Sequence, residues 1–305
     1  MLESELVQWV HKIDTPEIAE QRWHEYTRRR QSGQVFSRES TPSNTSLFAA
    51  AYFLSLPGRV ATLGGVRAEQ PKFGSQLVNE LASQCLASGI EQVQAITSTN
   101  AKSASEILLA SDMKWVTQVA HIFRRADEDV QRTSPPPELV LCSASEFAAC
   151  RVAQIIQATF SGTQDCPEIN GLRSPNDVLL GFLEGVPLRC CDSWFIAMYR
   201  GEIAGCLLLT TASATLTELS YVGVLPGFRQ LGIGKSLIGS ALQISRRCGA
   251  DHLAAAVDCR NAPALRAYDA FGFEHHLSLD VWLHREHLNR ASVAIEPARS
   301  SEKRL

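Results

Sequence analysis

The sequence predicts a mixed α/β fold of two tandem domains, each a mixed, largely antiparallel sheet flanked by helices. Runs rich in strand-forming residues alternate with segments of helical periodicity, and 305 residues are enough for two ordinary domains. The pattern around Leu77 and Gly89 returns around Leu237 and Gly249 at a constant offset of 160 positions, which indicates a duplicated fold. Between the copies, "ADEDVQRTSPPPE" is charged and proline-rich, as interdomain linkers are. We therefore expect domains over residues 1–130 and 137–289, followed by a polar tail over residues 290–305.

The second copy predicts the element order β-α-α-β-β-β-α-β-α-β. Ser174 or Asn176 can cap its second helix, and Arg200-Gly201 is a turn between two β-rich runs. Gly249 and Gly272 follow the last two helices, where glycine commonly ends a helix. The expected segments are strand 138–144, helices 147–160 and 174–184, hairpin 194–210, strand 214–224, a helix from 233, strand 252–258, helix 262–271 and strand 277–284.

The stretch "VLPGFRQLGIGKSL" at residues 224–237 places a glycine turn between a strand and a helix, which is a common cradle for anions. A nucleotide-binding P-loop would need glycine where Arg229 stands. A dinucleotide-binding turn would need glycine where Leu237 stands. Both of these interpretations fail on spacing.

The longer segment "ELSYVGVLPGFRQLGIGKSL" resembles the pyrophosphate loop of the GNAT superfamily of acyl-CoA N-acyltransferases. The family pattern V-x-P followed by R-x-x-G-x-G is met by Val224, Pro226, Arg229, Gly232 and Gly234. The resemblance implies that main-chain amides of this loop bind the diphosphate of acetyl-CoA, with charge from Arg229 and Lys235 at the rim. The residues implied in cofactor binding here are Arg229, Gln230, Leu231, Gly232, Ile233, Gly234 and Lys235.

A second signature lies about 30 residues downstream, where the family has N-x-x-A-x-x-x-Y-x-x-x-G-F. Asn261, Ala264, Tyr268, Gly272 and Phe273 match it, and the first three share one face of a helix. By resemblance, Asn261 and Ala264 border the cofactor, and Tyr268 protonates the departing thiolate. A phenol is suited to this because it is a neutral proton donor at neutral pH.

The resemblance also implies that the strand before the glycine loop binds the pantetheine arm of the cofactor through main-chain groups of Val222 to Val224, as an added strand would. A main-chain N–H near Val224 could also stabilise the oxyanion formed on attack. Glu218 is the best-placed carboxylate for a general base, although it could equally be a solvated strand residue. Asp258 is the weaker second choice.

The first copy lacks these features. Its loop "RAEQPKFGSQ" is two positions shorter and contains Pro71, which has no N–H to donate. Its second helix has an apolar run, Ile107 to Leu109, in the region of the tyrosine, and Asp112 replaces the glycine. We expect it to be a degenerate copy without a CoA site. This layout resembles tandem GNAT enzymes such as mycothiol synthase.

Composition excludes several other classes. A net charge of −3 and a pI of about 6.3 argue against nucleic-acid binding. The longest apolar runs are too short to cross a bilayer, and the acidic beginning "MLESELVQWV" is unlike a secretory signal. Nine cysteines without a C-x-x-C pair suggest reduced thiols, a cytoplasmic location and no zinc site. Cys190-Cys191 and His275-His276 lack metal-ligand spacing.

We therefore expect direct acetyl transfer from acetyl-CoA to a small-molecule or peptide amine, without a covalent enzyme intermediate, a metal, nucleic acid or a membrane. No cysteine lies in a recognised nucleophile motif, and Cys259 is nearest to the signature helix. The alternatives are a non-catalytic acyl-CoA-binding regulatory protein and a structural scaffold. In the expected acceptor loop, Asp165, Glu168 and Asp177 either attract a cationic amine or are solvated loop charges.

Overall fold

The computed structural model describes residues 16–31, 34–40, 49–126, 136–184, 188 and 192–288. Most of the expected linker and the expected tail over 290–305 lie outside these residues. The first half of the described chain contains α2 (Pro16–Gln31), β1 (Val35–Ser40), β2 (Ala49–Leu56), β3 (Val60–Ala68), α3 (Pro71–Ala87), β4 (Gln92–Ser98), α4 (Lys102–Leu109) and β5 (Met113–Arg125).

The second half follows the order that the sequence predicts, with three short 3₁₀ turns added. Ser174 caps α6, and Gly249 and Gly272 both have positive φ just after their helices. The elements are β6 (Leu139–Ser143), η1 (Ala144–Glu146), α5 (Ala149–Ala158), η2 (Pro167–Ile169), α6 (Pro175–Leu183), β7 (Trp194–Tyr199), β8 (Glu202–Thr211), β9 (Leu216–Val224), η3 (Pro226–Phe228), α7 (Ile233–Arg247), β10 (His252–Asp258), α8 (Ala262–Asp269) and β11 (Glu274–His284).

The internal repeat is visible in the element boundaries. Strand β4 and helix α4 in the first half begin and end 160 positions before β10 and α8 in the second half. Each half also runs through three strands, a helix, a strand, a helix and a final strand. The repeated sequence pattern therefore corresponds to repeated structure.

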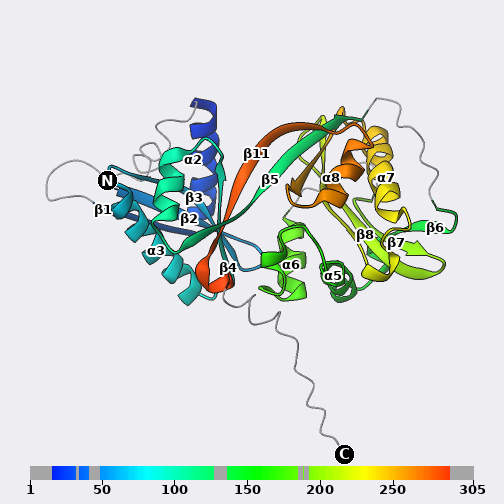
Figure 1. Ribbon diagram of the computed structural model, residues 1–305, viewed down its shortest axis with the longest axis horizontal. Coiled ribbons are helices and arrows are strands. Elements are labelled where there is room, and N and C mark those ends of the chain that lie inside the picture. Colours follow the sequence, from blue (N-terminus) through cyan, green and yellow to red (C-terminus); the bar gives the residue numbers. More distant parts are fainter. Residues whose placement is uncertain are drawn as a thin grey trace, which may run out of the picture.

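All described strands form one sheet of 11 strands in the order β1-β2-β3-β4-β11-β5-β10-β9-β8-β7-β6 (Figure 1). The pairs β3–β4 and β9–β10 are parallel and the other pairs are antiparallel, so the expected mixed, largely antiparallel sheet is confirmed. The final strands of the two halves are interleaved. Strand β11 lies between β4 and β5, whereas β5 lies between β11 and β10. The halves thus share the middle of the sheet, while the boundary between 1–130 and 137–289 stays a prediction.

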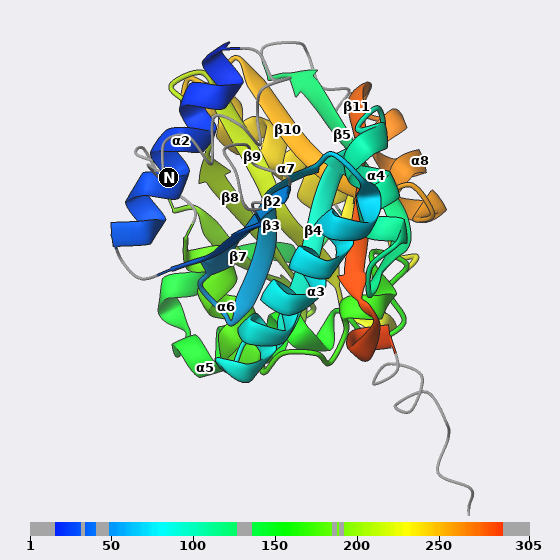
Figure 2. The ribbon, with the colours of Figure 1, turned by 90° about the vertical axis from the view of Figure 1, so that its left-hand side faces the viewer.

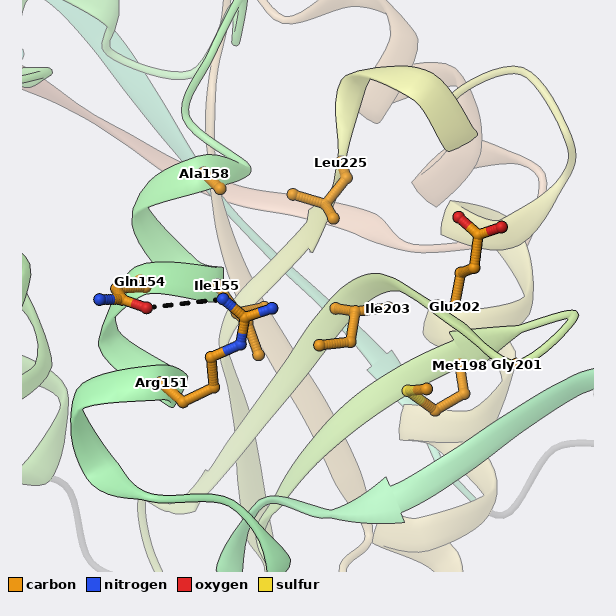
Figure 3. Close-up of a pocket in the computed structure, with 9 residues that line it drawn as sticks. All are labelled: Arg151, Gln154, Ile155, Ala158, Met198, Gly201, Glu202, Ile203 and Leu225. Carbon is orange, nitrogen blue, oxygen red and sulfur yellow. Dashed lines mark hydrogen bonds between the residues drawn. The ribbon is translucent and has the colours of Figure 1, made fainter.

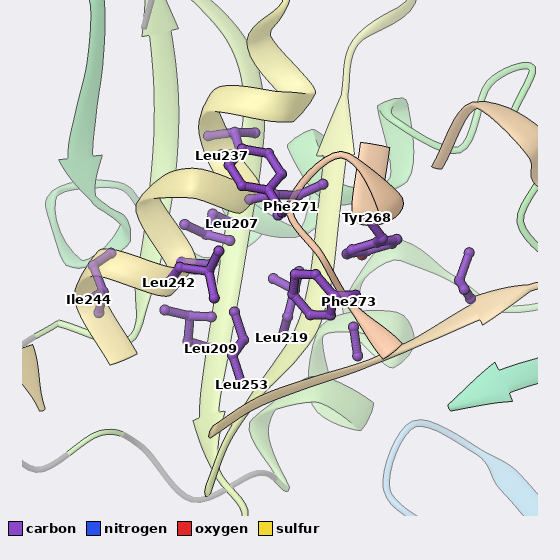
Figure 4. Packing of buried hydrophobic residues seen from close by; sticks show 14 of the residues in the cluster. Leu207, Leu209, Leu219, Leu237, Leu242, Ile244, Leu253, Tyr268, Phe271 and Phe273 are labelled. Atoms are coloured by element: carbon purple, nitrogen blue, oxygen red, sulfur yellow. The ribbon is translucent and has the colours of Figure 1, made fainter. Parts of the chain in front are cut away.

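Helices cover the two ends of this sheet. In the first half, α3 lies across β2, β3 and β4 (Figure 2). In the second half, α7 and α8 cover one face, and Leu237 and Leu242 of α7 pack with Leu207 and Leu209 of β8 (Figure 4). On the opposite face, buried residues of α5 and α6 form a separate cluster with β7 and β8. The second half is therefore a sheet between two helical layers.

Two further findings bear on the sequence predictions. The helices of the described residues are all too short or too polar to cross a membrane. The expectation that all thiols are reduced is wrong for Cys248, which is disulfide-bonded at the end of α7. The other described cysteines are free, namely Cys85, Cys142, Cys150, Cys166, Cys206 and Cys259.

Candidate functional site

The glycine loop forms an open turn at the start of α7. Gln230 has φ 64° and Gly232 has φ 80°, both in the left-handed region, and Gly232 is the N-cap of the helix. Alternation of this kind turns successive N–H groups toward one side, and the helix N-terminus adds positive potential. A Cβ added at Gly232 would meet only Pro136 Cγ at 3.9 Å, and one at Gly234 only Val224 Cγ2 at 3.8 Å. The loop therefore fits an anionic group, because described side chains do not fill the space beside these two glycines.

Arg229 corrects one expectation for this loop. Its guanidinium donates to the carbonyl oxygens of Val224 (3.1 Å), Thr159 (3.0 Å), Ser161 (2.7 Å) and Gly162 (3.0 Å). Three of these carbonyls lie at and after the C-terminus of α5, where unpaired carbonyls and the helix dipole attract a cation. Arg229 therefore ties the loop to α5 rather than presenting its charge at the rim.

Lys235 is exposed in the first turn of α7 and remains the candidate rim charge. An anion bound at the N-terminus of α7 would lie near Lys235, because this lysine belongs to the first turn of the same helix. The loop residues Gln230, Leu231 and Gly232 are also exposed, whereas Ile233 is buried in the core. The exposed part of the loop is therefore the part whose main chain has the left-handed geometry.

Strand β9 has an open edge beside the loop. It pairs with β10 only from Leu216 to Leu219, and a register shift on its β8 side marks a bulge at Ser220. Beyond that point, Val222 and Val224 pair with β8 on one edge and with no described strand on the other. An extended ligand can add to such an edge through main-chain hydrogen bonds.

Tyr268 and Asn261 lie on the helix that borders this opening. Asn261 Oδ1 accepts a hydrogen bond from the Ala264 N–H (3.2 Å), so the predicted cap of α8 is confirmed. Tyr268 is 5% exposed, and its ring meets that of Phe273 edge-on at 5.1 Å (Figure 4). Burial, and then the nearby charge of Asp165, raises the pKa of the phenol, which stays protonated at neutral pH. Among the described residues, none hydrogen-bonds its hydroxyl.

The three loop carboxylates have different environments. Glu168 forms an ion pair with Arg260 (2.6 Å), and Asp177 bonds the capping Ser174. Asp165 instead accepts from the Asp258 N–H (2.9 Å), and its pKa is raised by burial and by the Asp258 charge, with Asn261 opposing the shift. Its charge acts on Tyr268, so the carboxylate lies near the phenol. Glu168 is thus neutralised by an ion pair and Asp177 is engaged at a helix cap, whereas Asp165 is held beside the separated strands.

Asp258 is not placed to act as a base. Its side chain is fully buried and accepts hydrogen bonds from Thr117 Oγ1 (2.8 Å), the Cys166 N–H (3.0 Å) and Arg260. Burial favours the protonated form, but the bonds from Arg260 and Thr117 outweigh it and lower the pKa of the carboxyl. We therefore withdraw Asp258 as the second choice for the base, because it serves as a buried acceptor that ties β10 to β5.

Glu218 is exposed on β9, opposite Ala254 of β10. No described residue donates a hydrogen bond to its carboxylate, and its charge acts on His121 of β5. The sequence interpretation missed His121 because β5 belongs to the first half. The motif spacing carries no signal that this strand inserts beside β10.

The structure also contains a pocket of about 500 Å³ between α5 and the β7–β8 hairpin (Figure 3). Arg151 and Gln154 approach it from α5, and Glu202 and Ile203 from the hairpin. Leu225, just before the glycine loop, also lines it, but none of the predicted site residues does. In the described part of the chain, no cluster of His, Cys, Asp or Glu side chains could hold a metal ion.

Comparison with known proteins finds a matching family model over part of the chain. The sequence model of the acetyltransferase (GNAT) family matches residues 158–273, from the last residue of α5 to the start of β11. This range includes the glycine loop and the helix with Asn261 and Tyr268. A search of curated protein sequences finds no match.

Several solved structures share the fold at low identity. A GCN5-related N-acetyltransferase from Sphaerobacter thermophilus has a TM-score of 0.56 at 15% identity, covering 78% of this chain and 76% of that one. One from Kribbella flavida has a TM-score of 0.52 at 14% identity, covering 88% and 94%. A GCN5-related glucosamine N-acetyltransferase region in a fungal multi-domain β-N-acetylglucosaminidase has a TM-score of 0.57 at 12% identity, covering 82% and 33%.

Proposed function

Because the sequence model of the acetyltransferase (GNAT) family matches residues 158–273, we propose that the protein is an N-acetyltransferase that transfers the acetyl group of acetyl-CoA directly to an amine. One observation carries the proposal. The open edge of β9 after Leu219 leads directly into an unfilled amide turn at the N-terminus of α7. An extended pantetheine arm and a diphosphate need this combination of a strand edge and an anion cradle.

The residues that would hold acetyl-CoA follow from this geometry. Main-chain amides of Gln230 to Lys235 would face the diphosphate, and Val222 to Val224 would pair with the pantetheine amides. Asn261 and Ala264 begin the helix that borders the thiol end. When bound, the cofactor supplies a thioester carbonyl that a neutral amine can attack. The degenerate first half would not add a second site, so we expect one acetyl-CoA per chain.

The acid–base roles follow from the side chains. Glu218 is exposed and lacks a described hydrogen-bond donor, so its carboxylate is available to accept a proton from the amine. Tyr268 is kept protonated by its burial and can therefore donate to the departing thiolate. Burial also raises the pKa of the Cys166 thiol, which makes it a poor nucleophile and favours direct transfer.

Thiol release from acetyl-CoA in the presence of a panel of primary amines tests this function on the full chain. Tyr268→Phe should lower turnover about 100-fold, the lower end of what a positioned proton donor contributes, and leave acetyl-CoA affinity nearly unchanged. Tyr199→Phe, which alters a strand tyrosine packed on Phe228, is the matched control and should retain activity.

The alternative is a non-catalytic acyl-CoA-binding regulatory protein. Calorimetry would then detect acetyl-CoA binding, but no thiol would be released with any amine. That result would exclude the enzyme. Equal turnover of wild type and Tyr268→Phe would remove the tyrosine from the mechanism.

A further inference from the structure

Strand β5 brings a residue of the first half to the catalytic half. Its segment Val119–Arg125 pairs with His252–Asp258 of β10 over seven consecutive residues. Ala120 and Ile122 enter the same buried core as Leu253 and Ala255 of β10. Because side chains alternate across a strand, His121 faces the other side of the sheet, where it is exposed.

Glu218 lies on that same side. Its neighbour Leu219 enters the core with Ala255, so Glu218 points to the opposite face. In the strand register, Glu218 is beside Ala254, and His121 is beside Ala256. Glu218 and His121 therefore lie on the same face on either side of β10, with His121 diagonally across and Phe123 directly across Ala254. Ala256 is exposed although β10 is a central strand of the sheet, so this face is not covered at that point.

The electrostatics of His121 agree with this placement. Partial burial and the nearby His276 of β11 lower its pKa, while the charge of Glu218 opposes them, and the net shift is downward. The imidazole is therefore neutral at pH 7. Phe123 lies on the same face of β5 as His121. The centroid of its ring is 6.0 Å from that of His252 and 5.8 Å from that of His276.

We propose that His121 of the first half, together with Glu218, accepts the proton of the acceptor ammonium, and that the acceptor lies over Ala254 and Ala256. This inference rests on the proposed acetyltransferase function. An N–H bond of the ammonium breaks and an N–H bond forms at an imidazole nitrogen, which later releases that proton to solvent. The freed lone pair attacks the thioester carbon, and the C–S bond then breaks. The departing thiolate takes its proton from Tyr268, and the phenolate is reprotonated by the second N–H proton, which the nitrogen loses as the amide forms. The first half would thus complete the acceptor side of the site without binding a cofactor itself.

Steady-state kinetics of His121→Gln test the proposal, since glutamine retains hydrogen bonding but does not accept a proton near neutral pH. We expect kcat/KM for the amine to fall about 100-fold, the lower end for loss of a general base because Glu218 remains, while KM for acetyl-CoA changes less than about 2-fold. The acid limb of the pH profile should move toward lower pH, where only a carboxylate titrates.

His275→Gln is the matched control. His275 is also exposed, but its register partner is the core residue Ile122, so it faces the other side of the sheet, and its ring bonds Ser278 Oγ at 2.9 Å. This variant should match wild type. An active wild type with unchanged rate and pH profile in His121→Gln would overturn the proposal and leave the transferase function intact. Absence of thiol release by wild type would count against the function itself.

A measurement independent of activity checks the pairing. In NMR titrations of the histidine ring protons, the His121 signal is identified by its absence in His121→Gln. Glu218→Gln should lower the titration midpoint of that signal, because it removes the carboxylate that favours the imidazolium. The His275 signal should be unaffected. An unchanged His121 midpoint would show that the two side chains do not interact and would overturn the proposal.

Discussion

Replacing Arg229 distinguishes two roles for this residue in the glycine loop: binding the cofactor or stabilising the fold. If its charge served the cofactor, Arg229→Ala would weaken acetyl-CoA binding and leave folding unchanged. The structure instead shows one guanidinium donating to four carbonyls, which join the loop after β9 to the end of α5. We therefore expect Arg229→Ala to destabilise the protein before any ligand is added.

The size of the effect follows from these bonds. A hydrogen bond to a charged group contributes about 1.5–3 kcal/mol, so four independent bonds would give about 6–12 kcal/mol. Ser161 and Gly162 are exposed and can bond to water once the arginine is gone, so the bonds to Val224 and Thr159 dominate the net loss, at about 3–6 kcal/mol. For a chain of this size, such a loss lowers Tm by about 5–9 °C.

Thermal unfolding followed by circular dichroism, without ligand, measures this loss, and calorimetry measures acetyl-CoA affinity. Lys235→Ala is the control, because this exposed lysine should lower affinity and leave Tm within about 2 °C, as a surface substitution does. Arg229→Lys should resemble Arg229→Ala, since a single ammonium does not reproduce the planar fork. An Arg229→Ala protein with wild-type Tm and strongly reduced affinity would refute the reasoning.

Two further predictions concern stability and folding. Burial raises the pKa of Asp165, so its ionised form destabilises the fold; Asp165→Asn should therefore be more stable than wild type at pH 7. By linkage, denaturant titrations should show this advantage shrinking as pH falls toward 4, where wild-type Asp165 is protonated, and an advantage independent of pH would contradict the assignment. Residues 137–289 expressed alone would lack β5, leaving the adjoining edges of β10 and β11 without their partner. We expect this fragment to aggregate or self-associate in size-exclusion chromatography, and a stable monomer would show that the half folds independently.

The sequence predicts the local structure of the second half well, because its signals are local. Asn261 caps α8 as its position before the helix indicates, and Gly232 adopts the positive φ that a strand-to-helix turn requires. The role of Arg229 was mistaken because three of its four acceptors lie about 70 positions away, beyond any motif window. The disulfide of Cys248 was likewise missed, since cysteine counts do not report which thiols meet in space.

Strand partners are less predictable than strand positions. The period of two in β5 and β11 indicates which side chains share a face, but it does not specify the neighbouring strand. The contribution that we propose for His121 follows only from the insertion of β5 beside β10. A residue that one half contributes to the proposed site of the other is therefore found from the fold, even where the glycine loop is recognised in the sequence.

The interleaving of β5 and β11 also sets an order of events during synthesis. Strand β4 emerges early from the ribosome, yet its sheet neighbour β11 is translated roughly 180 residues later, at Glu274–His284. Until then, the edges of β4 and β5 that will receive this strand have no native partner. Termination of the chain just before Glu274 would therefore leave β4 and β5 of the first half without their neighbour β11, and would also remove the last strand of the second half.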